Sequence, residues 1–424
     1  MKTNEKDTKL RIVPALRFPE FSEAGAWAII TLNKLASRII KKNNGHICRV
    51  LTNSAADGVV DQTDYFDRNI VSEKNLHNYY VIENGDYVYN PRISTSAPVG
   101  PISKNYIGQG VMSPLYTIFR FHNDHNEFHN QYFKTKYWHK YLKNIANQGA
   151  RFDRMNITTD DFMNMPIPAP CQKEQQKIAD CLSSIDALIK AAENKIDELK
   201  AHKKGLMQQL FPAEGKTVPA LRFPEFQNAG EWKPYKLNDF GSFFRGLTYS
   251  TTDASNDNDG IGVLRSTNIQ NNRLILDKDL VFVNKTCTSE QRLQKGDVVI
   301  CMSNGSKALV GKNAELDQDI SYNLTVGAFC SIFRPKNVFA KYLLQTDSYT
   351  KFVALAIGGG NINNLKNSDL ENFVQFAPVK PVEQQKIADC LSSVDDLITI
   401  QTNRLEALKA HKKGLMQQLF PNIE

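Results

Sequence analysis

The sequence predicts an α+β protein built from two copies of one unit, each a mixed α/β domain followed by a long helix. Two observations carry this prediction. The segment Glu174–Pro212 returns as Glu383–Pro421, with 29 of 39 aligned positions identical. A shorter segment, "VPALRFPEF", occurs at Val13–Phe21 and again at Val218–Phe226. A lead-in and a tail repeated around two less similar stretches indicate a tandem of two diverged units.

The repeated tail has the pattern of a helix that needs a partner helix. Its apolar residues recur at steps of four and three, which is the heptad spacing of a helix–helix seam. Proline is absent until Pro212 or Pro421, where a helix has to stop. We therefore expect two helices that pair with each other under pseudo-two-fold symmetry. Their predicted seam consists of Ile178, Leu182, Ile185, Ile189, Ile196, Leu199, Ile387, Leu391, Val394, Ile398, Leu405 and Leu408.

Two lysines interrupt this apolar seam at equivalent positions, Lys203 and Lys412. A charged side chain in a helix–helix seam lowers stability unless it has a dedicated partner. Our hypothesis is that the two lysines lie where a partner subunit packs.

The stretches between the repeats read as mixed α/β domains. Aligned fragments keep their order: "ENGDYVY" (Glu83–Tyr89) faces "QKGDVVI" (Gln294–Ile300), and "YTIFR" (Tyr116–Arg120) faces "CSIFR" (Cys330–Arg334). Strands flank the Gly-Asp turns, and helical stretches follow at 127–148 and 337–356. The predicted boundaries are a lead at 1–21, a first domain at 22–170, a helix at 171–212, a linker at 213–226, a second domain at 227–381 and a helix at 382–421.

Composition limits the classes of protein that fit. The 424 residues are 41% apolar and carry a net charge of +7. Residues 1–173 hold +6 and residues 213–382 hold +2, while the repeated tails are neutral. No apolar run approaches the ~20 residues of a membrane span, and the N-terminus has no apolar signal core, so we expect a cytoplasmic protein without a membrane partner. Seven scattered cysteines without a CxxC pair indicate reduced thiols rather than structural zinc.

No motif predicts catalysis, a resident cofactor or a metal. GxSxG and HExxH are absent, and "IGGGN" (Ile357–Asn361) lacks the Lys-Ser/Thr of a phosphate loop. It reads as a plain loop, with a backbone turn that approaches a DNA phosphate as the alternative. Histidines at 122, 125 and 129, with Asp124 and Glu127, have the residue types of a metal site. We interpret this stretch as a polar surface turn that begins a helix, because the second copy has no equivalent.

The net charge of +7, concentrated in the two domains, is compatible with a nucleic-acid partner. The candidate DNA contacts are then cationic, amide and tyrosine side chains in the loops of these domains. Arg and Lys suit guanine, Asn and Gln suit adenine, and phosphate contacts outnumber base contacts. In the first domain the candidates are Asn90, Arg92, Lys104, Tyr106, Arg151 and Arg154. In the second domain they are Arg245, Tyr249, Arg265, Asn268, Asn304, Lys307 and Asn361.

Two variable domains, each preceded by "RFPEF" and followed by "EQQKIADCLSS…LKAHKKGLMQQLFP", resemble the specificity subunit of a type I restriction–modification system. The resemblance covers essentially the whole chain, most strongly in the repeated helices. It implies that each domain is a target-recognition domain reading one half of a split DNA site. It also implies that the helices pack antiparallel and set the unread gap. Because the two domains share little sequence, the two half-sites should differ.

The resemblance also implies the partners of the chain. Two methyltransferase subunits, which use S-adenosylmethionine, would dock on the repeated regions and methylate a flipped-out adenine at N6. Two restriction subunits, which use ATP and Mg²⁺, would join them, and the chain itself would bind double-stranded DNA without catalysing a reaction.

Two other classes of protein remain open. A coiled-coil scaffold would bind DNA without sequence preference, or not at all. A self-contained methyltransferase would need a glycine-rich cofactor loop and a Pro-Pro motif, whereas "YNPR" (Tyr89–Arg92) has one proline and no such loop before it.

Overall fold

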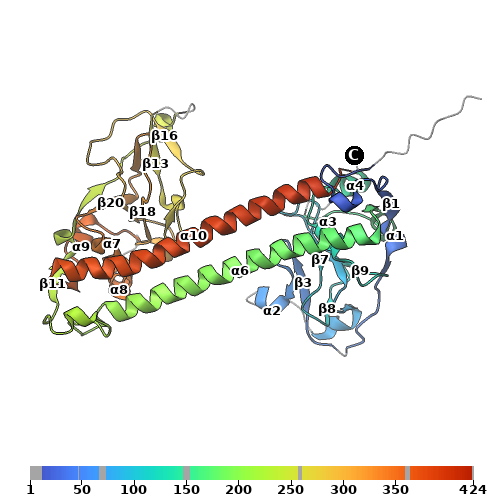
Figure 1. Cartoon of the computed structure of the whole chain (residues 1–424), viewed down its shortest axis with the longest axis horizontal. Coiled ribbons are helices and arrows are strands. Elements are labelled where there is room, and N and C mark those ends of the chain that lie inside the picture. Colours follow the sequence, from blue (N-terminus) through green and yellow to red (C-terminus); the bar gives the residue numbers. More distant parts are fainter. Residues whose placement is uncertain are drawn as a thin grey trace, which may run out of the picture. The chain divides into compact units, whose positions relative to one another are not determined.

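The computed structural model describes residues 12–45, 47–65, 73–146, 153–255, 260–358 and 363–422. These form two compact units. Unit 1 comprises Met1–Glu193 together with Asn403–Glu424, and unit 2 comprises Asn194–Thr402. Each unit therefore contains one α/β domain and one end of each long helix, and the predicted α+β class is confirmed (Figure 1).

Unit 1 is built on a four-stranded antiparallel sheet with the strand order β2-β9-β6-β7. Three two-stranded pairs surround it, β1-β10, β3-β4 and β5-β8. The strands are β1 (Ala28–Thr31), β2 (Ala36–Arg38), β3 (Leu51–Ser54), β4 (Gly58–Asp61), β5 (Tyr80–Ile82), β6 (Tyr87–Tyr89), β7 (Ile102–Lys104), β8 (Gly110–Met112), β9 (Thr117–Phe121) and β10 (Pro166–Ala169). The short helices are α1 (Leu32–Leu35), α2 (Gln62–Tyr65), α3 (Glu127–Phe133), α4 (His139–Ile145) and α5 (Thr159–Met163).

Unit 2 has a six-stranded sheet, β12-β20-β17-β18-β15-β14, a three-stranded sheet, β16-β13-β19, and the pair β11-β21. Its strands are β11 (Lys233–Lys236), β12 (Gly241–Arg245), β13 (Ile261–Leu264), β14 (Ile269–Gln270), β15 (Arg273–Leu274), β16 (Val281–Val283), β17 (Val298–Cys301), β18 (Asn313–Glu315), β19 (Leu324–Val326), β20 (Cys330–Pro335) and β21 (Val374–Ala377). Its short helices are α7 (Phe339–Leu343), α8 (Asp347–Gly358) and α9 (Asn367–Glu371).

The two sheets share a four-strand core, because β12-β20-β17-β18 repeats the order β2-β9-β6-β7. The Gly-Asp turns explain why these fragments align. Buried Asp86 accepts a hydrogen bond from the Glu83 amide and pairs with Arg120. Asp297 does the same with the Gln294 amide and Arg334. Each aspartate ties a turn to the neighbouring strand, so the motif persists while the loops around it diverge.

The two long helices form as the heptad pattern predicts. Helix α6 covers Gln172–Leu210 and α10 covers Pro381–Leu419, 39 residues each. Both end just before Pro212 or Pro421. All twelve predicted seam residues are buried or half-buried. The other helical stretches are shorter than expected: 127–148 holds the separate helices α3 and α4, and 337–356 holds α7 and most of α8.

The core of each unit contains residues of one domain, of the first turns of the long helix that follows this domain, and of the last turns of the other long helix. In unit 1, Leu419 and Phe420 of the α10 end pack with Ile178 and Leu182 of the α6 start and with the domain. In unit 2, Leu210 and Phe211 pack in the same cluster as Ile387 and Leu391. The helix ends are apolar in both copies because each end is buried in a domain.

The helix ends run antiparallel within each unit. In unit 1, Asp186 of α6 pairs with Lys412 of α10, and Glu193 further along α6 pairs with the earlier Lys409. In unit 2, Lys203 Nζ lies 2.7 Å from Asp395 Oδ1. The Lys203 and Lys412 side chains are 14% and 13% exposed and pair with aspartates inside the chain, which accounts for both charges in the seam. Our hypothesis that a partner subunit packs at these lysines stays a prediction.

The repeated "RFPEF" lead-ins anchor the helix starts. Arg17 donates two hydrogen bonds of 2.7 Å to the carboxylate of Glu174, which is buried at the first turn of α6. Arg222 binds Glu383 in the same bidentate way, at 2.7 and 2.9 Å. Such paired arginine–carboxylate geometry fixes direction as well as distance. The lead-in is therefore repeated because each helix start needs the same clamp.

Across the residues that the structure describes, no helix is both long enough and apolar enough to cross a bilayer.

Candidate nucleic-acid interface

A rigid turn in unit 2, Gly327–Cys330, is the point where several loops meet. The Cys330 amide donates to the Gly327 carbonyl, which closes the turn. The Gly327 amide donates to Leu264, and the amides of Met302 and Ser303 both donate to the Phe329 carbonyl. The turn is thus held by the exits of β13 and β17 as well as by its own hydrogen bond. We refer to Gly327–Cys330 as the hub turn.

The exit of β12 lies against the same turn. Leu247 forms a parallel bridge with Gly327, and its amide donates to Val326 at 2.7 Å. A Cβ placed on Gly246 would lie only 2.1 Å from the Gly327 carbonyl oxygen, so the close approach needs glycine at position 246. Backbone contacts from three strand exits leave the hub turn little freedom.

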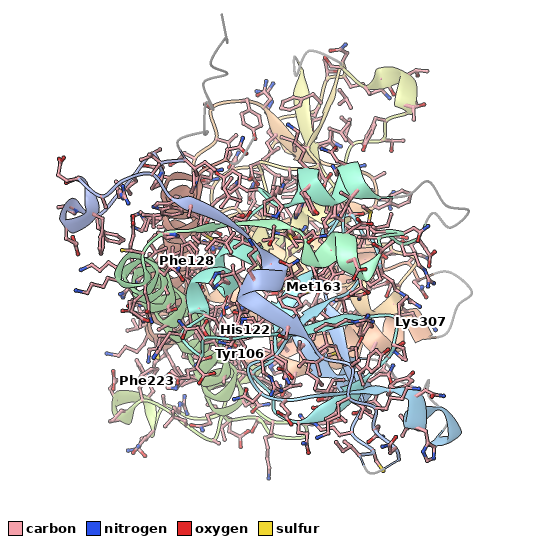
Figure 2. All side chains as sticks on the ribbon, turned by 90° about the vertical axis from the view of Figure 1, so that its right-hand side faces the viewer. Tyr106, His122, Phe128, Met163, Phe223 and Lys307 are labelled. Carbon is pink, nitrogen blue, oxygen red and sulfur yellow. The ribbon has the colours of Figure 1, made fainter. Side chains whose placement is uncertain are left out.

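Four of the predicted DNA contacts in unit 2 lie on segments that join the hub turn. Arg245 ends β12 and is exposed, and Arg265 follows Leu264, with its guanidinium donating to the Asp279 carbonyl at 3.0 Å. Asn304 follows Ser303 and donates to Ser266 Oγ at 3.1 Å. Lys307, labelled in Figure 2, is exposed at the start of a short 3-10 helix, Lys307–Leu309. The structure thus brings together the loops that carry these residues.

Two other predicted residues of unit 2, Tyr249 and Asn268, make contacts inside the unit. Tyr249 is half-buried against the apolar cluster that contains Leu247 and Val263. Asn268 is 1% exposed; its amide donates to two backbone carbonyls, and its Oδ1 accepts from the Arg265 amide. The Asn268 side chain therefore holds the loop that carries Arg265 and is not free to meet a base.

Unit 1 has an equivalent loop junction at the exit of β6. Arg92 forms an antiparallel bridge with Arg154, as Ser303 does with Asn364 in unit 2. The Met155 amide donates to Pro91, and the Leu365 amide donates to Met302, both at 2.8 Å. Arg92 is exposed, and Arg154 is half-buried beside Asp153. The two predicted contacts Arg92 and Arg154 therefore lie at the positions that Ser303 and Asn364 occupy in unit 2, next to Asn304.

Asn90 has a structural role at this exit. Its amide donates to the Asn53 carbonyl, and its Oδ1 accepts from the Arg92 amide. It is buried and shapes the turn that exposes Arg92. Arg151 and Asn361, the remaining predicted contacts, lie outside the described residues, shortly before Arg154 and Asn364 in the chain.

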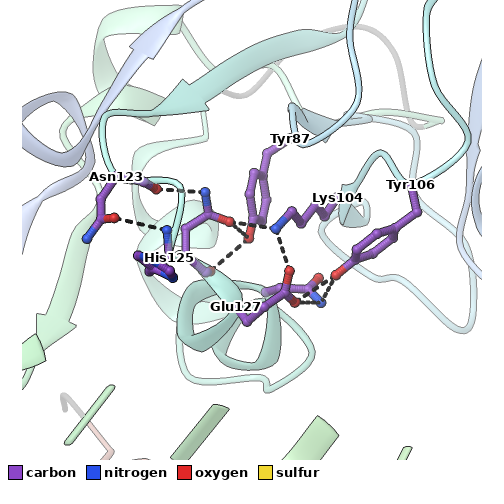
Figure 3. A network of polar contacts seen from close by, with 8 residues as sticks. Tyr87, Lys104, Tyr106, Asn123, His125 and Glu127 are labelled. Carbon is purple, nitrogen blue, oxygen red and sulfur yellow. Dashed lines mark hydrogen bonds and ion pairs between the residues drawn. The ribbon is translucent and has the colours of Figure 1, made fainter. Parts of the chain in front are cut away.

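Lys104 and Tyr106 belong to a polar network of unit 1 (Figure 3). The Lys104 ammonium binds Glu127 and Asn126, and the Tyr106 hydroxyl donates to Glu127 at 2.7 Å. Burial raises the pKa of Glu127, but the hydrogen bonds from Lys104 and Tyr106 outweigh it and bring that pKa below its usual value. Lys104 is thus occupied by a carboxylate, whereas the ring of Tyr106 is 58% exposed.

The histidines of this region do not converge. His122 lies 2.8 Å from Ser37 Oγ, and His125 is exposed. His129 is buried, stacked 4.3 Å from Phe121, and neither ring nitrogen has a hydrogen-bond partner. Burial lowers the pKa of His129 to about 4. Our reading of the stretch as a polar surface turn is correct for His122 and His125 and wrong for His129. Within the described ranges, no three His, Cys, Asp or Glu side chains are grouped to hold a metal ion.

Sequence reasoning missed two residues at the unit 2 junction. The Asn363 amide donates to the carbonyls of Asn304 and Gly305, which joins two loops. Phe329 sits at a corner of the hub turn and is 70% exposed. A phenylalanine beside an apolar strand reads as core from sequence, and only the turn geometry shows that it points outward.

Comparisons with known proteins identify the family. The model of the type I restriction modification DNA specificity domain matches twice, at residues 34–201 and 229–410. The chain belongs to this family. Both matches begin within a domain and run into the following long helix, so the repeat seen in the sequence is a repeat of the family's own domain.

Individual relatives agree with this assignment. The EcoKI specificity subunit of Escherichia coli (strain K12) is 34% identical over 165 residues, which are 37% of this chain and 34% of the relative. The StySPI specificity subunit of Salmonella potsdam is 33% identical over 199 residues, 45% of this chain and 42% of the relative. The alignments thus span less than half of these relatives' own lengths.

A solved structure extends the likeness over the chain. The S subunit of a type I restriction–modification system from M. genitalium has a TM-score of 0.56 at 14% identity, covering 97% of this chain and 100% of that one. At this identity, the likeness shows that the two chains share the fold.

Proposed function

We propose that this chain is the DNA-reading subunit of a type I restriction–modification complex, in which each domain reads one half of an asymmetric split site. The observation that carries the proposal is the contrast at equivalent positions of one fold. At the equivalent positions of the loop junction, unit 1 has Arg92 and Arg154 whereas unit 2 has Ser303 and Asn364, with Asn304, Lys307 and Asn363 beside them. Different hydrogen-bonding groups on a common frame suit two different base sequences.

The long helices would set the number of unread base pairs between the half-sites. Antiparallel contacts inside each unit support this proposal, since a pseudo-two-fold pair of readers fits two half-sites about one helical turn, roughly 34 Å, apart. Exposed residues repeated in both helices, such as His202 and His411, offer the same surface twice. That repetition suits two copies of a methyltransferase subunit, with two restriction subunits completing the complex.

In this proposal the chain contributes recognition and assembly rather than catalysis. S-adenosylmethionine would be bound by the methyltransferase subunits, and ATP with Mg²⁺ by the restriction subunits. Adenine-N6 methylation would follow base flipping in the partner. The side chains of this chain would hold the duplex in register while the partner acts.

The deciding experiment is a base-resolution map of N6-methyladenine. DNA is compared from cells expressing this chain with its methyltransferase subunit and from cells expressing that subunit alone. The expected result is a new split motif, two short half-sites separated by a fixed number of unread bases. A stable complex without chain-dependent methylation would instead favour a scaffold.

A further inference from the structure

Phe329 is a large apolar side chain held rigidly in an exposed position. It is 70% exposed, although burial of such a ring is normally favourable. Two backbone amides bind its carbonyl, from Met302 at 2.8 Å and from Ser303 at 3.2 Å, and the next amide in the chain closes the hub turn. The ring is therefore presented by a fixed backbone rather than by a loop that can fold it inward.

The surroundings of the hub turn are polar and cationic. The segments bonded to it lead directly to Asn304, Arg245 and Arg265, and Lys307 follows on the next short helix. An apolar protein partner would leave these groups without hydrogen-bond acceptors. A DNA duplex supplies phosphates and base edges for the polar groups, and it carries one apolar group in the major groove, the C5-methyl of thymine.

We propose that Phe329 contacts the C5-methyl group of a thymine in the half-site read by unit 2. The inference rests on the proposed function and adds a base identity to it. A rigid ring that is flanked by hydrogen-bonding side chains selects thymine over cytosine at one position, because cytosine has no methyl group there. The ring itself makes no hydrogen bond, so it adds a signal that Asn304 and its neighbours do not provide.

The corresponding turn of unit 1 lacks such a ring. The aligned fragments "YTIFR" and "CSIFR" place Leu115 opposite Phe329, and Leu115 is half-buried. The thymine contact is accordingly confined to one half-site. This asymmetry gives the test an internal reference, the other half-site of the same duplex.

The test removes the methyl group from the DNA and the ring from the protein. Once methylation mapping has given the target, duplexes are made in which each thymine of the unit 2 half-site is replaced in turn by deoxyuridine. Binding is measured for the complex of the full chain with its methyltransferase subunit. We expect one replacement to weaken binding about three- to tenfold, the size of a lost methyl contact. Phe329→Ala should weaken binding to the unmodified duplex by a similar factor.

The decisive result is non-additivity. In the Phe329→Ala complex, the critical deoxyuridine should have no further effect, because the contact is already gone. Val338→Ala is the matched control: Val338 is also exposed but follows the far end of β20, whose start carries the hub turn. Thymines in the unit 1 half-site should respond equally in both complexes.

Three outcomes would overturn the inference while leaving the proposed function intact. These are a unit 2 half-site without thymine, deoxyuridine replacements that are all silent in the unsubstituted complex, or a deoxyuridine effect that persists in Phe329→Ala. Loss of binding in Phe329→Ala with silent deoxyuridines would instead indicate a ring inserted between base steps. Absence of any chain-dependent methylation would remove the proposed function first, and this inference with it.

Discussion

The two units attach their helices alike and differ in what surrounds the attachment. In unit 1, Asp186 of α6 pairs with Lys412 of α10 and accepts a hydrogen bond from Gln131 of the domain helix α3. In unit 2, Asp395 of α10 pairs with Lys203 of α6 and accepts a hydrogen bond from Tyr342 of α7. One aspartate thus joins three elements in each unit, but the domain offers an amide in one case and a phenol in the other. The lysine–aspartate contact between the helices is thus the same in both units, whereas the contact from the domain differs.

A second difference concerns the buried tryptophans that follow each lead-in. Trp232 Nε1 donates to Glu383 at 3.1 Å, the same carboxylate that Arg222 binds. Trp27, its counterpart, has a buried Nε1 without a hydrogen-bond partner. Unit 2 therefore satisfies a polar group that unit 1 leaves unsatisfied, which costs stability in unit 1.

The largest expected effect comes from breaking the clamp at a helix start. Glu383→Ala leaves Arg222 buried without its counter-charge, and we expect unit 2 to lose about 3–5 kcal/mol. Glu174→Ala should destabilise unit 1 by less, because Glu174 receives no tryptophan bond. Hydrogen exchange resolved by unit measures both changes, since a two-unit chain has no single free energy of unfolding. Equal losses would show that the Trp232 bond contributes nothing.

The second-largest expected effect is that mild acid lowers the stability of unit 1 but not that of unit 2. Of eight histidines, only the exposed His202 lies in unit 2, whereas unit 1 buries His129. Burial lowers the pKa of His129 to about 4, against about 6.5 in the unfolded chain. The unfolded state therefore binds the extra proton first, and stability falls as pH drops from about 6.5 towards 4, by about 2 kcal/mol at pH 5.

Unit-resolved hydrogen exchange at pH 7 and pH 5 measures this prediction. His129→Leu should reduce the pH dependence of unit 1 without abolishing it, because burial also lowers the pKa of His139 to about 4, and it should leave unit 2 unchanged. An unreduced pH dependence of unit 1 in the His129→Leu variant would show that His129 does not contribute, and His139→Leu would then be tested next.

A smaller effect is expected from the lysines of the seam. Burial raises the pKa of Asp186, but the hydrogen bonds from Lys412 and Gln131 outweigh it and bring that pKa below its usual value. Lys412→Met should therefore cost unit 1 about 1–2 kcal/mol, moderated by the bonds that Gln131 and Lys134 keep to Asp186. Lys409→Ala is the matched control, because its pair with Glu193 is exposed and should contribute below about 0.5 kcal/mol. Losses of the same size in both variants would argue against a special role for Lys412.

The smallest effect concerns the proposed DNA faces. Arg92→Ala should weaken DNA binding by about two- to fivefold for every sequence and reduce the salt slope by about 0.9, as the loss of one phosphate contact does. Lys307→Ala provides the comparison in unit 2. Titrations between 50 and 200 mM salt, roughly the range in which such slopes are measured, give both numbers. A change in the methylated motif, with the slope unaltered, would mean that Arg92 reads a base.

The sequence predicts the helices and the repeat well because both depend on local periodicity. Heptad spacing and Pro212 locate α6 to within two residues. The fate of polar loop residues is not predictable in this way, since Asn90 and Arg92 are two residues apart, and only the first is turned inward to bind Asn53. Whether an amide holds a loop or faces solvent depends on carbonyls that lie far away in the chain. The exposure of Phe329 depends in the same way on the exits of two distant strands.

Unit 2 is one uninterrupted stretch, Asn194–Thr402, whereas unit 1 also needs Asn403–Glu424. A ribosome releases the first domain before the second, yet the core of unit 1 lacks Leu419 and Phe420 until the second domain has already emerged. The unit that is begun first is therefore completed last. During synthesis, the apolar surface that binds the α10 end stays open, while the identical "LMQQLF" segment at the end of α6 has already been made. Correct assembly thus requires this surface of the first domain to stay unoccupied until the end of α10 has been translated.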